Sequence, residues 1–213
     1  MLDLRIMVLN YKRPSNVHLI INAYKDYYPI TVINNNPNEL FPYVGKPVDV
    51  INNHKNYYCM ERWMRCYEYP ESYKLILDDD LLIDTQSILK MRKKRQTIVG
   101  IYGKANVSTA SRYEDLKDNW CVDAENDFLV GSAIMVRQDK LDMIQPYLEK
   151  IGYPERGDDI IVSYLLKKYT GCWMKTVQAK VLNLPEGEVG LNKDPNHFSM
   201  RWKVVEKFKN LTW

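Results

Sequence analysis

The stretch Leu75-Ile76-Leu77-Asp78-Asp79-Asp80-Leu81-Leu82 places three consecutive carboxylates between two aliphatic runs. Burying an ionised carboxylate is costly unless it meets a cation or reaches solvent. A short apolar run of this kind is typical of a buried strand. The stretch therefore predicts a strand that crosses the core and delivers three acidic groups to one edge of a sheet.

Short apolar runs alternate with amphipathic stretches on both sides of this strand. We expect strands at residues 4–9, 30–33, 48–51, 74–77, 97–102, 128–136 and 173–184. We expect helices from residue 14, around 60–67, after the triplet, and at 140–151, 158–168 and 200–210, with Pro146 disturbing the helix that contains it. In the first of these, Leu19, Ile20, Ala23 and Tyr24 would share the buried face. In the second, the spacing of Met60, Trp63, Met64 and Tyr67 predicts the buried face and leaves Arg62 and Arg65 away from its centre. Such alternation is typical of βαβ units. The predicted fold class is α/β with a mixed, mostly parallel central sheet, and residues 103–119 are expected to be loop-rich.

The composition indicates a single soluble domain. The chain has 213 residues, of which 46% are hydrophobic and 27% charged, which suits one sizeable core. No run approaches the roughly 20 apolar residues of a membrane span, and the start lacks the pattern of a signal peptide. Four scattered cysteines indicate neither zinc nor disulfides, and a net charge of +3 does not predict nucleic-acid binding. We expect a cytoplasmic protein whose oligomeric state is left open.

The acidic triplet is a candidate metal site. In a strand, the side chains of Asp78 and Asp80 would share one face and Asp79 would point the other way. Ligands of open α/β sheets bind beyond the carboxyl ends of the strands. Two carboxylates on one face suit Mn²⁺ or Mg²⁺ completed by phosphate oxygens. The alternative is that the triplet only ends a strand and caps the next helix.

Glycine-rich phosphate-binding motifs are missing from the sequence. No Gly-x-Gly-x-x-Gly follows an expected strand, and Gly152 and Gly157 have the spacing of a P-loop but lead into two aspartates. A diphosphate would then be held by a metal and by cationic side chains. Arg13, Arg62 and Lys55 are the candidates.

A second acidic pair and one histidine complete the candidates. Asp158 and Asp159 stand at an expected helix start, where one of them would be the N-cap. The other would be free to accept a proton from an acceptor hydroxyl or to orient a sugar, and the sequence does not say which. His197 lies in a polar turn, where it is either a surface residue or a ligand for metal or phosphate.

Taken together, these motifs resemble those of the GT-A glycosyltransferases, in particular the exostosin-like group and a chlorella-virus glycosyltransferase domain. The matching motifs span most of the chain and are Asn10-Tyr11-Lys12-Arg13-Pro14, Asn34-Asn35-Asn36-Pro37, Asn56 with Arg62, the acidic triplet, Val130-Gly131-Ser132-Ala133 and Gly157-Asp158-Asp159-Ile160. The chain departs from the exostosin pattern in its shorter length and in lacking a membrane anchor and secretory cysteines.

The resemblance implies a single GT-A domain, an α/β/α sandwich over residues 1–213. Residues 1–100 would form a nucleotide-binding half and residues 101–213 an acceptor-binding half. The implied activity is metal-dependent transfer of a hexose, or a deoxyhexose such as rhamnose, from a UDP-sugar to an oligosaccharide or glycoprotein glycan. The resemblance leans towards retention of the anomeric configuration. The viral likeness further implies virus glycan synthesis in a host cytoplasm, and the abrupt end at Trp213 suggests one module of a longer protein.

The resemblance also implies roles for individual residues. The residues that would bind uridine and diphosphate are Asn10, Arg13, Asn35, Asn56, Arg62 and Asp79. Asp78 would contact the ribose or a metal-bound water. Asp80 would bind Mn²⁺ directly, with Asp78 and His197 as further candidate ligands, and Asp158 or Asp159 would face the transferred sugar.

Two alternatives to sugar transfer remain at this point. A phosphatase of the haloacid-dehalogenase type also carries Asp-x-Asp after an apolar strand and a later acidic pair. Here, however, the triplet comes late in the chain and Leu82 stands where that family usually has Thr or Val. The second alternative is a non-catalytic module that binds nucleotides or glycans with the same fold.

Overall fold

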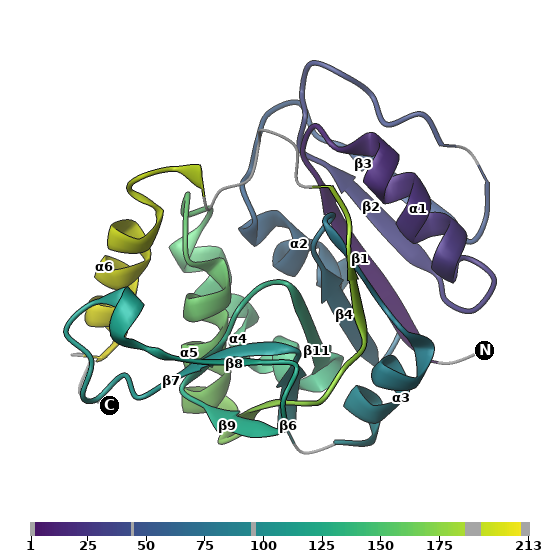
Figure 1. The fold of residues 1–213 in the computed structure, drawn as a ribbon. Helices are drawn as coiled ribbons and strands as arrows, with labels where there is room; N and C mark the ends of the chain where they lie inside the picture. The colour runs from purple at the N-terminus through teal and green to yellow at the C-terminus, as the bar shows by residue number, and fades with distance from the viewer. Residues whose placement is uncertain (1–2, 44, 95–96, 186–192, 210–213) are drawn as a thin grey trace.

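The computed structural model describes residues 3–43, 45–94, 97–185 and 193–209, and its elements form an α/β fold (Figure 1). The strands are β1 (Leu4–Asn10), β2 (Ile30–Asn34), β3 (Val48–Asn52), β4 (Tyr73–Leu77), β5 (Leu81–Ile83), β6 (Thr97–Gly100), β7 (Tyr102–Ala105), β8 (Lys117–Trp120), β9 (Ala124–Asn126), β10 (Phe128–Leu129), β11 (Ala133–Arg137), β12 (Trp173–Thr176) and β13 (Val181–Asn183). The helices are α1 (Pro14–Tyr24), α2 (Met60–Met64), α3 (Thr85–Lys93), α4 (Gln138–Ile151), α5 (Asp158–Thr170) and α6 (His197–Lys209), with single 3-10 turns η1 (Arg65–Glu68) and η2 (Tyr113–Asp115).

The main sheet is mixed and mostly parallel, as the sequence predicts. In the described residues its order is β3-β2-β1-β4-β11-β6-β12-β9. All strands run in one direction except β11 and β9, which are antiparallel to their neighbours. One continuous sheet therefore carries both expected halves of the chain. Their boundary at residue 100 does not follow the sheet, because β6 lies between β11 and β12.

Helices cover both faces of this sheet, and strand β1 shows why. Successive side chains of a strand point to opposite faces. Leu4, Ile6 and Val8 join a core with buried residues of α1 and α3, whereas Met7 joins a second core with buried residues of α2, α4 and α5. The result is the predicted three-layer arrangement, with the hydrophobic residues of β1 buried on both sides.

The buried face of α1 differs from the expected one. The sequence pattern placed Leu19, Ile20, Ala23 and Tyr24 on the inner face. In the structure Leu19 is 49% exposed and Ala23 is exposed, while Val17 and Ile21 are fully buried beside Ile20 and Tyr24. The apolar residues of α1 allow two overlapping buried faces. Packing against β1 and β2 selects one of them, and the local sequence pattern carries no information about that packing.

Several expected elements of the second half are divided or extended. The segment expected to be loop-rich contains β7 and β8, which form a three-stranded sheet with β10. The strand expected at 128–136 is divided into β10 and β11, and the one at 173–184 into β12 and β13. Helix α4 continues through Pro146, and α6 begins at His197, earlier than expected, while Asn210 lies outside the described residues.

None of the described helices is both long and apolar enough to cross a membrane.

Candidate functional site

A cavity of about 730 Å³ lies where the chain leaves β1 and β4. Its walls come from segments far apart in sequence: the loops after β1 and β4, the loop before α2, the start of α5, the β7 and β8 strands, and α6. Among the described residues, six acidic and four basic side chains line it, which are Asp78, Asp79, Asp80, Glu155, Asp158 and Asp159, and Arg13, Arg62, Arg156 and Arg201. The formal charge of the lining side chains is therefore −2.

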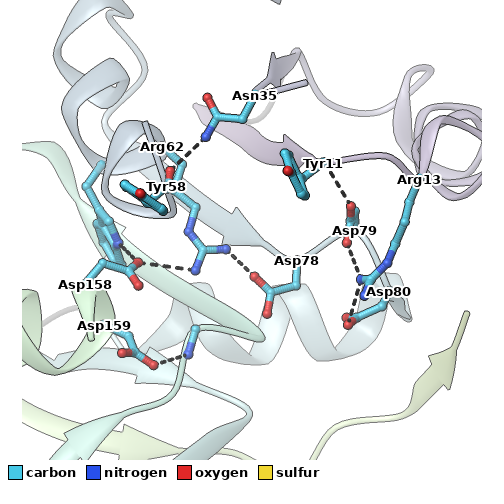
Figure 2. A network of polar contacts seen from close by, with 12 residues as sticks. Tyr11, Arg13, Asn35, Tyr58, Arg62, Asp78, Asp79, Asp80, Asp158 and Asp159 are labelled. Carbon is cyan, nitrogen blue, oxygen red and sulfur yellow. Dashed lines mark hydrogen bonds and ion pairs between the residues drawn. The ribbon is translucent and has the colours of Figure 1, made fainter. Parts of the chain in front are cut away.

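The acidic triplet lies in this cavity, but not as an extension of the strand. Strand β4 ends at Leu77, and the triplet forms the connection to β5. Asp78 pairs with Arg62, whereas Asp79 and Asp80 share Arg13, at 2.7 and 3.3 Å from its Nη1 (Figure 2). The alternation that would place Asp78 and Asp80 on one strand face is therefore wrong, because the strand has already ended.

The three carboxylates differ in exposure. The Asp78 and Asp80 side chains are 35% and 28% exposed, against 10% for Asp79. Burial raises the pKa of Asp78 to about 6, although Arg62 acts in the opposite direction. Burial likewise raises the pKa of Asp79 to about 6 against the effect of Arg13. Asp79 is thus the most enclosed member, and Asp78 and Asp80 are the ones most open to a ligand.

Arg62 connects the triplet to the second acidic pair. The sequence placed it away from the centre of the buried face of α2, yet its side chain is only 3% exposed. Nη1 donates to Asp78, and Nη2 lies 3.4 Å from Oδ2 of Asp158 (Figure 2). Gly131 makes room for it, since a Cβ at that position would lie 2.5 Å from Nη2.

The two aspartates at the start of α5 have different surroundings. Neither is the N-cap: that residue is Gly157, at φ +78° and with no side-chain cap, which corrects the prediction that Asp158 or Asp159 caps the helix. Oδ2 of Asp158 accepts a 2.8 Å hydrogen bond from Nε1 of Trp63. Asp159 accepts from the backbone N–H of Gly131 at 2.9 Å and from Nη2 of Arg201 at 2.8 Å.

These surroundings shift the two pKa values in opposite directions. Burial raises the pKa of Asp158 above its ordinary value, despite the nearby Arg62. Burial would also raise the pKa of Asp159, but Arg201 and the backbone N–H donors lower it below its ordinary value. Asp159 is thereby a fixed anion that holds α6 and Gly131, and Asp158 is the pair's candidate for proton transfer.

Two residues expected to bind the nucleotide lie outside the cavity wall. Asn10 donates to Asn34 at 2.8 Å and accepts from the backbone N–H of Arg13 at 3.3 Å. Asn35 is fully buried and donates to the carbonyl oxygen of Tyr58 at 2.9 Å (Figure 2). Both side chains are engaged with the polypeptide, so they position the loops of the site and do not line it.

Asn56 lines the cavity and orders its rim. Its Oδ1 accepts a 2.8 Å hydrogen bond from the backbone N–H of Tyr58, which has a left-handed φ of 58°. Such a conformation is costly for a residue with a side chain and persists where neighbours hold it. Lys55, in contrast, is exposed and rests over the ring of Tyr57, with Nζ 4.8 Å from its centroid.

His197 lines the cavity but does not complete a metal centre. Within the described part of the chain, no group of three His, Cys, Asp or Glu side chains is placed to hold a metal ion. Burial, Arg201 and Arg156 lower the pKa of His197 to about 4. Two neighbouring guanidinium groups disfavour a cation here, and the role of His197 as a ligand beside Asp78 and Asp80 stays a prediction.

Several residues of the site carry no signal in the sequence. Arg201 and Trp63 hold the acidic pair from helices α6 and α2, and the aromatic residues Trp120 and Phe198 form another part of the wall. Arg201 pairs with a residue 42 positions away and Trp63 with one 95 positions away, so no local motif contains either contact.

The fold and the cavity define an α/β protein with a cavity lined by charged side chains beyond the carboxyl ends of β1 and β4. No family model and no curated protein matches the chain. Among solved structures it is similar to the inositol-1-phosphate CTP transferase from T. maritima, at 8% identity over 97% of this chain and 96% of that one, with a TM-score of 0.47. It is also similar to the mannose-1-phosphate geranyltransferase from Thermus thermophilus, at 7% identity over 85% and 76% of the two chains, with a TM-score of 0.45. Both scores are below 0.5, so neither likeness bears on what this chain binds.

Proposed function

We propose that this chain is a metal-dependent glycosyltransferase that moves a sugar from a UDP-sugar to a glycan acceptor. The observation that carries the proposal is the grouping, in one cavity of about 730 Å³, of two partly exposed carboxylates with two arginines. Asp78 and Asp80 supply oxygen ligands, and Arg13 and Arg62 supply donors for phosphate oxygens. The uridine and the hexose or deoxyhexose follow from the resemblance to GT-A glycosyltransferases.

The charge of the cavity supports a divalent cation that arrives together with the diphosphate. A diphosphate adds negative charge to a wall whose side chains already sum to −2. Asp78 and Asp80 provide two hard oxygen ligands, which fit Mn²⁺ or Mg²⁺ when phosphate oxygens complete the shell. Such an ion would neutralise the charge that develops on the departing diphosphate. Arg62, which is buried and contacts Asp78, would stabilise the same charge through its guanidinium.

Asp158 is the proposed proton acceptor in this reaction. The acceptor oxygen forms a bond to the anomeric carbon, the bond from that carbon to the diphosphate oxygen breaks, and its electron pair leaves with UDP. The hydroxyl proton passes to Asp158, whose pKa is raised by burial and which Trp63 holds at the cavity wall. Asp159 positions Gly131 and Arg201 and touches no reacting atom in this scheme.

The test measures nucleotide and metal binding before turnover. Melting temperatures are recorded with UDP, GDP, CDP and ADP, each with and without Mn²⁺. We expect UDP with Mn²⁺ to stabilise the wild type most, and Asp80→Asn to lose the part that depends on Mn²⁺. Asp139→Asn, at an exposed residue that pairs with Arg137 on the surface, is the matched control and should behave like the wild type.

Turnover is then measured as hydrolysis of UDP-sugars with added Mn²⁺. Equal rates in the wild type and Asp80→Asn would remove the metal site. Binding of UDP with Mn²⁺ but no turnover with any donor and acceptor would indicate a non-catalytic module. Release of phosphate from phosphomonoesters without any nucleotide would favour the phosphatase.

A further inference from the structure

Two large aromatic side chains line the cavity without being buried in it. Trp120, at the end of β8, and Phe198, in the first turn of α6, are each 41% exposed, and both belong to the cavity wall. Keeping an apolar ring in contact with water inside a concave site is unfavourable, and a ligand that covers the ring would relieve this cost. The proposed binding of metal and diphosphate by Asp78, Asp80 and Arg13 does not involve these two rings.

The first ring is held in place by the strand pair β7 and β8. Trp120 lies directly opposite Tyr102 in the strand register, with ring centroids 5.2 Å apart and planes at 78°. The hydroxyl of Tyr102 donates to Asp118, which also pairs with Lys104 at 2.7 Å. Tyr102, which also lines the cavity, is thereby held in an edge-on contact with the indole of Trp120.

The second ring is supported by a buried tyrosine. Phe198 stacks on Tyr113, with centroids 5.6 Å apart and planes at 15°, and Tyr113 is only 3% exposed. The hydroxyl of Tyr113 accepts a 2.8 Å hydrogen bond from Nε of Arg201. Trp120 and Phe198 each contact a tyrosine ring whose hydroxyl is hydrogen-bonded, so together they form a preorganised apolar wall.

This aromatic wall is distinct from the charged part of the cavity. Figure 1 shows β7, β8 and α6 together on one side of the molecule, while β1, α1 and the loop that joins β1 to α1 lie on the other. The charges beside the aromatic wall are compensated: Arg201 pairs with Asp159, Lys104 with Asp118, and Arg156 with Asp194. The wall therefore suits an uncharged ligand with an apolar face.

We propose that Trp120 and Phe198 form the acceptor subsite and that it takes an uncharged pyranose ring. The face of a pyranose presents C–H groups to an aromatic ring, while its hydroxyl groups at the edge stay free for hydrogen bonds and solvent. The assignment rests on the proposed function, because it assumes that the charged part of the cavity holds the nucleotide diphosphate. Trp120 is then a determinant of acceptor binding and makes no contact with the nucleotide.

The experiment measures sugar binding and nucleotide binding separately. Methyl glycosides of neutral hexoses and deoxyhexoses, with glucuronate as a charged comparison, are titrated against the full chain with and without UDP and Mn²⁺. Binding is read by saturation-transfer NMR and by the melting temperature. Trp120→Ala and Phe198→Ala are compared with Trp173→Ala, a matched control at a 59% exposed tryptophan of β12 that is outside the cavity wall.

We expect neutral glycosides to bind the wild type and Trp173→Ala equally, and to bind Trp120→Ala about tenfold more weakly, which corresponds to the loss of one ring contact. UDP affinity should be the same in all four proteins. Unchanged glycoside binding in both Trp120→Ala and Phe198→Ala would overturn the subsite. Reduced UDP affinity in Trp120→Ala would also overturn it, because the indole would then contact the nucleotide.

Failure of the proposed function gives a different result. In that case the wild type itself shows no UDP binding with Mn²⁺, whatever happens at the aromatic wall. Preferred binding of glucuronate over neutral glycosides by the wild type would contradict the proposal that the subsite takes an uncharged ligand.

Trp120→Ala and Phe198→Ala both change exposed side chains, so their melting temperatures without ligand should match that of the wild type. A match excludes unfolding as the cause of lost binding.

Discussion

Arg201 donates a 2.8 Å hydrogen bond to Asp159, so a residue of the last described helix neutralises one of the two adjacent aspartates in the cavity wall. Its neighbour Asp158 has a different partner, the indole N–H of Trp63 at 2.8 Å. The pairing separates two residues that are chemically identical in the sequence. Asp159 holds α6 and Gly131 in place, and Asp158 is the residue that we propose as the proton acceptor.

The first prediction compares Asp158→Asn with Asp159→Asn. Asp159→Asn leaves the buried guanidinium of Arg201 without its anion, and breaking a buried pair in this way costs about 3 kcal/mol or more. Asp158→Asn keeps the wall intact but removes the proton acceptor, so stability should change less while transfer falls by about a hundredfold. Urea unfolding and single-turnover transfer assays measure the two effects. Equal losses of stability in both variants would contradict the division of roles.

The second prediction concerns the guanidinium between Asp79 and Asp80. Arg13→Ala removes the cation that lies 2.7 Å from Asp79, a side chain that is only 10% exposed. We expect a loss of about 3 kcal/mol in the free energy of unfolding at neutral pH, partly relieved at lower pH as Asp79 takes up a proton. Arg112→Ala, which breaks an ion pair of an exposed arginine with Asp115, is the control and should change the stability little.

The third prediction concerns the space beside Arg62. Gly131→Ala would place a Cβ 2.5 Å from Nη2 of Arg62, so the guanidinium must move away from Asp78 and Asp158. We expect UDP affinity with Mn²⁺ to fall at least about tenfold, the equivalent of one charge-assisted hydrogen bond. Isothermal titration calorimetry measures it. The control is Gly152→Ala, where an added Cβ would meet no atom within 4 Å. Because Gly152 has a positive φ and lies outside the cavity wall, this substitution should lower stability and leave UDP affinity unchanged. Retained affinity in Gly131→Ala would refute the prediction.

The fourth prediction is a pH dependence that originates at His197. Burial, together with Arg201 and Arg156, lowers its folded-state pKa from 6.5 to about 4. Asp159 and Asp194 also face it and act in the opposite direction. Between these two values the unfolded chain binds a proton that the folded chain does not, so this residue's contribution to stability is present above pH 6.5 and is lost as the pH falls towards 4.

His197→Asn isolates this effect, because Asp78 and Asp79 titrate in the same range with the opposite sign. Their folded-state pKa values are raised to about 6, so they favour folding more at low pH. The free energy of unfolding is measured in urea at intervals from about pH 7 to about pH 4.5 for both proteins. Wild type should lose more stability than His197→Asn as the pH falls. Parallel curves would show that His197 is not held neutral by its surroundings.

Much of the fold could be predicted from local patterns. The strand of Leu75, Ile76 and Leu77 and its βαβ neighbours are recognisable because each is a short apolar run between amphipathic stretches. The segment with β7 and β8 was missed, since Lys117-Asp118-Asn119-Trp120 buries mainly Asn119 and shows no apolar alternation. The α1 face was wrong at Leu19 for a related reason: the helix has more apolar residues than its packing needs.

For the site, the sequence by itself determined which groups are present and that Asp78, Asp79 and Asp80 follow a buried strand. The cost of burying a carboxylate requires each member of such a triplet to meet a cation or to reach solvent. Which cation meets which carboxylate was decided by the tertiary structure. Arg62 pairs with Asp78 across 16 residues and approaches Asp158 across 96. Contacts between residues so far apart in the sequence depend on how β4, α2 and α5 pack together, and no local pattern of residues encodes them.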